Sequence, residues 1–312
     1  MTRQIVIGAG AGLVLLAAIV GIMVLTGDEG AEAAFEPVPS LEYEYGSNHI
    51  HGLGHNHNDD RLLLATHFGM FAIEDGQLFQ VGDARDDFMG FTMNPHDPDE
   101  LFVSGHPLDG GNLGVKRSTD GGLNFEHLFD GVQNEVVDFH SMTLSAADPE
   151  RLYGAFQGLL YRSDNRGEDW VAFDADGLPE PGLCWGVPCL AADSDSPDTV
   201  YAGISGGLIR SLDAGETWEL VSDEPGQVAA VKVDPRNSDR IFAYTEHFGM
   251  AVSSDAGESW ESIHGDLPEV GTIGVVFAIA LDMNDDQRLF IANIDNHVYE
   301  TADGGQTWER IL

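Results

Sequence analysis

"SSDAGESW", residues 253–260, is the stretch that decides the fold, because variants of it recur along the chain. The other copies are "STDGGLNF" (118–125), "SDNRGEDW" (163–170), "SLDAGETW" (211–218) and "TADGGQTW" (301–308). Successive copies start 42 to 48 residues apart, and a weaker copy, "AIEDGQLF" (72–79), starts 46 residues before the first of them. A period of this length indicates a repeat architecture with one supersecondary unit per repeat.

Each repeat is predicted to contain four short strands. In the fifth unit they are the β-rich runs 227–234, 240–246, 249–254 and 259–263, separated by Asp, Pro, Asn and Gly. Four strands per repeat are typical of a propeller blade. Six units between residues 43 and 312 therefore predict an all-β, six-bladed β-propeller. Seven blades, the alternative, would require a further unit that the sequence does not supply.

The recurring fragments fit the Asp-box, S/T-x-D-x-G-x-x-W, also called the BNR repeat. The chain therefore resembles the Asp-box propellers: sialidases, sortilin-type ectodomains and the photosystem II assembly factor propeller. The resemblance covers nearly all of the chain after residue 42. Two copies depart from the pattern, because Asn165 replaces the aspartate of one box and Phe125 replaces the tryptophan of another.

The resemblance implies that the box is structural and closes the hairpin between the third and fourth strands of a blade. Its aspartates are expected to accept hydrogen bonds from turn amides, rather than to act in catalysis. The aspartates concerned are Asp120, Asp213, Asp255 and Asp303.

Sialidases act on the face opposite the boxes, with three arginines, a tyrosine–glutamate pair and an aspartate. The segments expected on that face contain no arginine or tyrosine at matching places, apart from Arg85. Without an arginine cluster to hold a carboxylate, true sialidase activity is not expected. A glycoside hydrolase that uses a pair of carboxylates is the alternative function. The carboxylates expected on this face are Asp86, Asp87, Asp138, Glu246 and Asp295.

Histidines concentrate on the same face, beginning with "SNHIHGLGHNHND" at residues 47–59. Alignment of the innermost strands puts His51, Met89 and His140 at equivalent positions around the axial channel. His49 precedes His51 by two residues and lies on the same side of its strand, and His67 and His106 come from adjacent loops. The sequence therefore predicts a metal site for copper or zinc, built from His49, His51, His67, His106, His140 and Met89. His55 and His57 are expected in a solvent-exposed turn.

Residues 5–25 form a run of 21 uncharged, mainly apolar residues, long enough to span a bilayer as a helix. Arg3 precedes the run and acidic residues follow it, so the bulk of the chain is expected outside the cytoplasm. The predicted organisation is a membrane anchor or signal segment (1–25), a linker (26–42) and the propeller (43–312). Secretion after cleavage at the Ala31-Glu32-Ala33 site is the alternative to a single-pass membrane protein.

Acidic residues outnumber basic ones by 53 to 14, which gives a formal net charge of −39. Such a charge repels nucleic acids and is typical of proteins kept soluble in strong brine, so a halophilic source is predicted. In an exported domain, Cys184 and Cys189 are expected to form a disulfide. The overall prediction is a monomeric, membrane-tethered module that binds a protein, a glycan or a metal ion, and this binding role is favoured over an enzymatic one.

Overall fold

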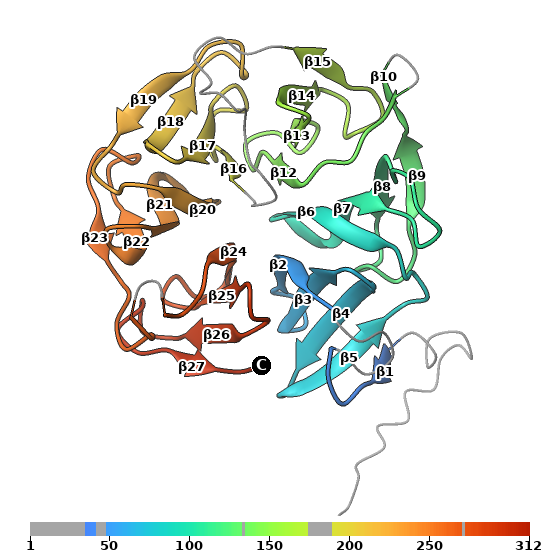
Figure 1. Ribbon diagram of the computed structural model, residues 1–312, viewed down its shortest axis with the longest axis horizontal. Helices are drawn as coiled ribbons and strands as arrows, with labels where there is room; N and C mark the ends of the chain where they lie inside the picture. Colours follow the sequence, from blue (N-terminus) through green and yellow to red (C-terminus); the bar gives the residue numbers. More distant parts are fainter. Residues whose placement is uncertain (1–34, 42–47, 133–134, 174–188, 270–271) are drawn as a thin grey trace, which may run out of the picture. The chain divides into compact units, whose positions relative to one another are not determined.

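The computed structural model describes residues 35–41, 48–132, 135–173, 189–269 and 272–312, and within these residues the strands form a ring of six sheets (Figure 1). The first three blades contain, from the channel outward, β2 (Ile50–Asn56), β3 (Arg61–Thr66), β4 (Gly69–Glu74) and β5 (Gln77–Val81); β6 (Asp87–Asn94), β7 (Asp97–His106), β8 (Val115–Ser118) and β9 (Glu126–Phe129); and β12 (Ser141–Leu144), β13 (Leu152–Phe156), β14 (Leu159–Ser163) and β15 (Val171–Phe173).

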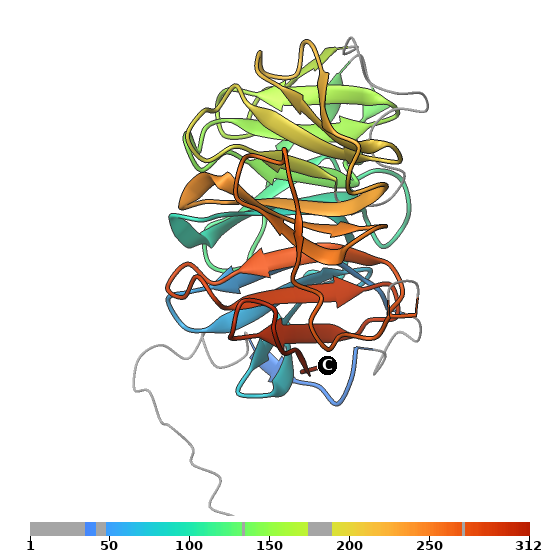
Figure 2. The ribbon, with the colours of Figure 1, turned by 90° about the vertical axis from the view of Figure 1, so that its left-hand side faces the viewer.

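The last three blades follow the same order. They contain β16 (Leu190–Ala192), β17 (Val200–Ile204), β18 (Gly207–Ser211) and β19 (Glu219–Ser222); β20 (Val228–Asp234), β21 (Asn237–Thr245), β22 (Gly249–Ser253) and β23 (Glu261–Ser262); and β24 (Val276–Leu281), β25 (Leu289–Asn293), β26 (Val298–Thr301) and β27 (Glu309–Arg310). Within each blade, neighbouring strands are antiparallel and consecutive in sequence. The predicted six-bladed propeller is confirmed, and the edge-on view shows the strands running between the two faces of the ring (Figure 2).

Two short pieces lie outside the repeat pattern. β1 (Phe35–Pro37) pairs with β5 and adds a fifth strand to blade one, although it lies in the segment that the sequence predicts to be a linker. β10 (Gly131–Val132) and β11 (Glu135–Val136) pair with each other between blades two and three. None of the helices among the described residues is long and apolar enough to cross a membrane. The predicted anchor at residues 1–25 lies outside the described residues and stays a prediction.

The Asp-box turns are held by hydrogen bonds between the box residues themselves. In the last box, Asp303 Oδ1 accepts from the backbone N–H of Thr307 at 2.9 Å, and Asp303 Oδ2 accepts from the Thr307 hydroxyl at 2.7 Å. These bonds favour the ionised carboxylate and lower the pKa of Asp303 to about 2. Equivalent bonds hold the other three boxes that contain the aspartate, and the pKa values of Asp120, Asp213 and Asp255 are also lowered.

Four of the six innermost strands have a bulge near the start of the strand. The register shifts around His51 in β2, around Met89 in β6, around Ala229 in β20 and around Phe277 in β24. A β-bulge leaves one residue unpaired and redirects its side chain. Of the three positions that the sequence alignment makes equivalent, His51 and Met89 are thus bulged residues, and His140 immediately precedes β12, at the same mouth of the axial channel.

The blades pack closely around the channel. A Cβ atom added to Gly90 of β6 would lie 2.2 Å from the backbone oxygen of Phe139, which precedes β12. Only glycine permits the backbones of blades two and three to approach so closely. Phe139 itself packs against Trp170 within blade three, with ring centroids 4.9 Å apart. This approach brings the segment before β12 next to the start of β6.

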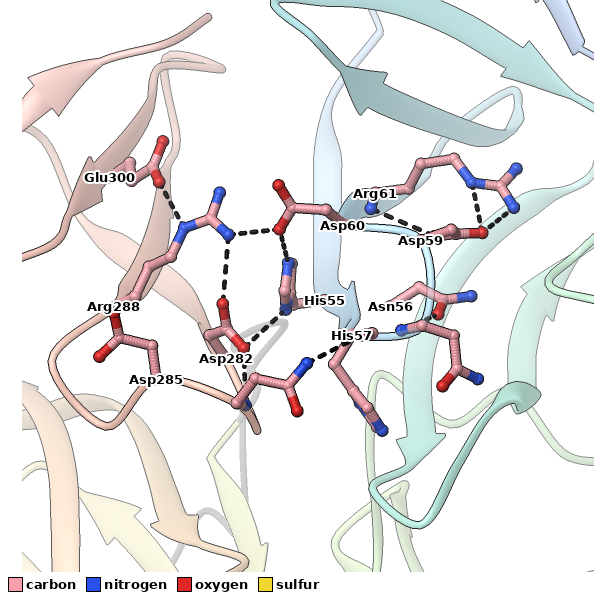
Figure 3. Close-up of polar contacts among 12 residues, drawn as sticks. His55, Asn56, His57, Asp59, Asp60, Arg61, Asp282, Asp285, Arg288 and Glu300 are labelled. Atoms are coloured by element: carbon pink, nitrogen blue, oxygen red, sulfur yellow. Dashed lines mark hydrogen bonds and ion pairs between the residues drawn. The ribbon is translucent and has the colours of Figure 1, made fainter.

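The ring closes between blades one and six without an exchanged strand among the described residues, so side chains hold the seam (Figure 3). Arg288 of blade six pairs with Asp60 of blade one, and its Nη1 also lies 3.1 Å from Asp282 Oδ2. His55 Nε2 lies 3.0 Å from Asp60 Oδ1, and the His55 ring stacks on Phe290.

The expectation that His55 lies in a solvent-exposed turn is wrong. His55 is part of β2 and only 2% exposed, because its ring fills the seam between the two blades. Burial lowers its pKa. His57 lies past the strand end and is half-buried, and its backbone oxygen accepts a hydrogen bond from Asn284.

Candidate metal centre

Histidines from blades one to three meet at the channel mouth that carries the bulges. His51 comes from β2 and His67 from the turn between β3 and β4. Asp87 begins β6, directly opposite His106 at the end of β7. His140 immediately precedes β12. These three blades are consecutive around the ring, so loops far apart in sequence converge here (Figure 1).

A first group of ligand atoms contains His51, His67 and Asp87. His51 Nε2 lies 3.3 Å from His67 Nδ1. Asp87 Oδ1 lies 3.0 Å from His67 Nδ1 and 3.9 Å from His51 Nε2. All three residues are half-buried. Three ligand atoms of two imidazoles and one carboxylate therefore surround one small space.

A second group contains His106, Asp138 and His140. Asp138 Oδ2 lies 3.0 Å from His106 Nε2 and 2.7 Å from His140 Nε2. On the other side of the His106 ring, Nδ1 lies 3.5 Å from Asp87 Oδ2. The His106 imidazole thus stands between the two carboxylates, and Asp87 connects the two groups.

Asp138 is the most buried member of this cluster, with 6% of its surface exposed. Its Oδ1 atom has no hydrogen-bond partner among the described residues. A buried carboxylate oxygen without a donor is unfavourable, because desolvation is not compensated. A cation beside Asp138 would satisfy it.

The pKa values of two cluster histidines depart from the usual value in opposite directions. Burial, with the neighbouring His67 ring, lowers the pKa of His51 to about 4, so His51 is neutral at pH 7 and has a free lone pair. The hydrogen bond to Asp138 raises the pKa of His140. These opposite shifts follow from burial in one case and from a carboxylate partner in the other.

The structure brings four of the six predicted ligands into the two groups. His49 is exposed, and its ring centroid lies 5.2 Å from that of His67, beside the first group. Met89 is the half-buried bulge residue of β6, and its role as a ligand stays a prediction. Cys189 is disulfide-bonded, whereas Cys184 lies outside the described residues, so the predicted pairing stays a prediction.

Sequence reasoning missed Asp87 and Asp138 as metal ligands and named them only as carboxylates of the same face. A signal for both was present. Asp87 precedes Met89 by two residues and Asp138 precedes His140 by two residues, as His49 precedes His51. The repeat alignment therefore places three metal-capable side chains at one further equivalent position.

A third group of possible ligands is His55, Asp60 and Asp282 at the blade seam. Arg288 already pairs with both of its carboxylates (Figure 3). The guanidinium occupies the place that a cation would take, so this group is part of the closure and not a metal centre.

Comparison with known proteins supports the fold. A family model described as "Sortilin, neurotensin receptor 3" matches residues 206–312, which is about a third of the chain. A xyloglucanase of Hypocrea jecorina is 25% identical over 212 residues, which cover 64% of this chain and 23% of the relative. The chain therefore spans about a quarter of that curated relative.

Comparison with solved structures also supports the propeller fold. A GH74 xyloglucanase from Xanthomonas campestris superposes with a TM-score of 0.57 at 18% identity, covering 89% of this chain and 46% of the other. YCF48 from Cyanidioschyzon merolae superposes with a TM-score of 0.52 at 17% identity, covering 89% and 88%. The chain is thus an Asp-box propeller with the fold found in glycoside hydrolase, sortilin-type and YCF48 propellers.

Proposed function

We propose that this protein is a membrane-tethered, extracytoplasmic propeller that binds transition-metal ions at the channel mouth of blades one to three. The observation that carries the proposal is the pair of adjacent groups, each with two imidazoles and one carboxylate. Two histidines and a carboxylate are a ligand set for zinc, with further coordination positions left for water or a ligand. We therefore favour zinc over copper, because both groups consist of histidine nitrogens and carboxylate oxygens.

The spacing of the ligand atoms supports a metal. Around a tetrahedral zinc ion with bonds of about 2 Å, ligand atoms are roughly 3.3 Å apart. The three spacings in the first group are 3.0, 3.3 and 3.9 Å. In the second group, both histidine nitrogens lie within 3.0 Å of Asp138 Oδ2. Small side-chain shifts would therefore complete either site.

Asp87 has a second role in this proposal. Its Oδ2 faces His106 Nδ1, the ring nitrogen that would not bind the metal. Carboxylates commonly hold the remote N–H of a metal-bound histidine and thereby fix the ring orientation. Asp87 would thus be a ligand in the first site and an orienting partner in the second.

The number of bound ions tests the proposal. Equilibrium dialysis against zinc, followed by elemental analysis, should find about two ions per wild-type chain. H67A and H140A should each lose one ion, and the H67A/H140A double variant should lose both. The matched control is H127A/H247A, which removes two exposed histidines that belong to neither group. Zinc binding by the double variant equal to that of this control would refute the site.

Membrane tethering rests on the uncharged run at residues 5–25, with Arg3 before it and acidic residues after it. In cells, the full chain should sediment with membranes, and protease added outside should degrade the propeller. Recovery of the full chain in the cytosolic fraction would contradict the tether.

Glycoside hydrolysis is a second candidate function, favoured by the matches to xyloglucanases. Asp87 and Asp138 would be the carboxylate pair, since both lie at the same channel mouth with His106 between them. Release of reducing ends from xyloglucan, abolished by D138N and unaffected by a metal chelator, would support it. Xyloglucan left intact by the wild-type protein would argue against this activity and leave the metal site untouched.

A further inference from the structure

The other mouth of the axial channel contains an unusual lysine. Lys232 lies on β20, and it is one of only two lysines in the chain. Its side chain lines the channel together with Met93 of blade two and Thr143 of blade three. Lys232 follows the bulged Ala229 by three residues, roughly 10 Å along the strand. Lys232 therefore lies further along the same channel, whose lining also includes His51 and His140 of the histidine cluster.

Lys232 has no partner among the described residues. The other lysine, Lys116, pairs with Asp86 at 2.6 Å. No carboxylate or other acceptor contacts the Lys232 ammonium within the described part of the chain, although the sequence contains 53 acidic residues. Burial lowers the pKa of Lys232, and no neighbouring charge opposes this effect. An unpaired, partly buried ammonium is unfavourable unless an anion compensates it.

A second residue with an unsatisfied donor lines the same pocket. Ser194 of blade four and Lys232 both line a small pocket at this end of the channel. The Ser194 hydroxyl is buried and has no hydrogen-bond partner among the described residues. The rest of the lining is mainly apolar and includes Pro95 and Pro235, which have no backbone N–H. The lining of this pocket thus contains two residues with an unsatisfied donor and no carboxylate.

We propose that this pocket binds a small monovalent anion, a halide or the carboxylate of a small acid, through Lys232 Nζ and the hydroxyl of Ser194. The anion supplies the charge that the ammonium lacks and the acceptor that the hydroxyl lacks. A narrow site with one ammonium suits a small monoanion, because a phosphate would bring more charge than Lys232 can neutralise.

Bromide is the probe for the halide. Crystals of the wild-type protein soaked in sodium bromide should show an anomalous peak between Lys232 and Ser194. The peak should be absent from K232M, which keeps the aliphatic stem, and weaker in S194A. The matched control is K116M, which removes the same charge from the chain and should keep the peak. No peak in wild-type crystals, or an equal peak in K232M, would overturn halide binding.

A solution measurement separates the two anion sources. The melting temperature of the protein is measured in MES buffer, whose anion carries a bulky sulfonate group. Chloride or formate then replaces the MES anion at constant ionic strength, and the melting temperature is measured again. A rise with chloride identifies a halide site, and a rise with formate alone identifies a carboxylate site. Either rise should be at least halved in K232M and retained in K116M. If neither anion stabilises the wild-type protein more than K232M, the proposal is wrong.

Discussion

Nε2 of His140 lies 2.7 Å from Oδ2 of Asp138, two residues earlier in the chain. This contact raises the pKa of His140, because the carboxylate stabilises the protonated ring. A raised pKa means that the pair stabilises the fold below the unfolded value of about 6.5, and that this contribution is lost as the pH rises through the folded pKa.

The first prediction is that D138N lowers the pKa of His140 in the metal-free protein to 6.5 or below. Histidine NMR signals, followed from pH 4 to pH 9, measure it. D130N is the matched control, because Asp130 pairs with the exposed His127 and not with His140. If D138N leaves the His140 titration unchanged, the carboxylate is not the cause of the shift.

The second prediction concerns the seam between blades one and six. R288M should lower the free energy of unfolding by about 3 kcal/mol, because it leaves the buried Asp282 carboxylate without its guanidinium partner. Urea denaturation measures the change. R61M is the control, since Arg61 pairs with Asp59 in the nearby turn, and it should cost about 1 kcal/mol or less. Equal losses in the two variants would show that Arg288 does not hold the ring closed.

The third prediction concerns acid. The pKa of Asp303 is lowered to about 2 by its bonds to Thr307. A lowered pKa gives stability that is present above the unfolded value of about 3.8 and is lost as the pH falls toward 2. D303N should therefore melt below the wild-type protein at pH 7, and this difference should shrink between pH 4 and pH 2. D109N, in an exposed loop, should melt like the wild-type protein throughout. A difference that stays constant with pH would exclude ionisation of Asp303 as its origin.

The fourth prediction concerns salt. With a formal net charge of −39, self-repulsion opposes the compact state at low ionic strength, and salt screens it. Between low and molar sodium MES, the melting temperature should rise by roughly 5 °C, which corresponds to about 2 kcal/mol. MES is used so that filling of the Lys232 pocket does not contribute. A melting temperature that stays flat or falls would contradict adaptation to brine.

The sequence by itself determined the blades. The eight-residue box recurs with a period that holds the four short strands of a propeller blade. Its aspartates, glycines and hydroxyls interact within the box, so neighbouring residues suffice to specify the turn. The same period made His51, Met89 and His140 equivalent. His51 and Met89 then proved to be bulged residues of their strands, and the period thereby located the channel mouth where the histidines gather.

Only the tertiary structure decided which polar residues meet. The repeat alignment places Asp87 and Asp138 on the channel face, but their contacts with His67 and His106 exist only in the folded chain, because each histidine comes from a different blade from its carboxylate partner. His55 looked like a turn residue, but it is buried because blade six closes against it. Lys232 gave no sequence signal, since a lysine without a partner is recognised only from its surroundings. Hydrogen bonds between neighbouring residues specify the Asp-box turn of each repeat. Burial and contacts between residues far apart in the sequence determine whether the titratable side chains of each site are charged.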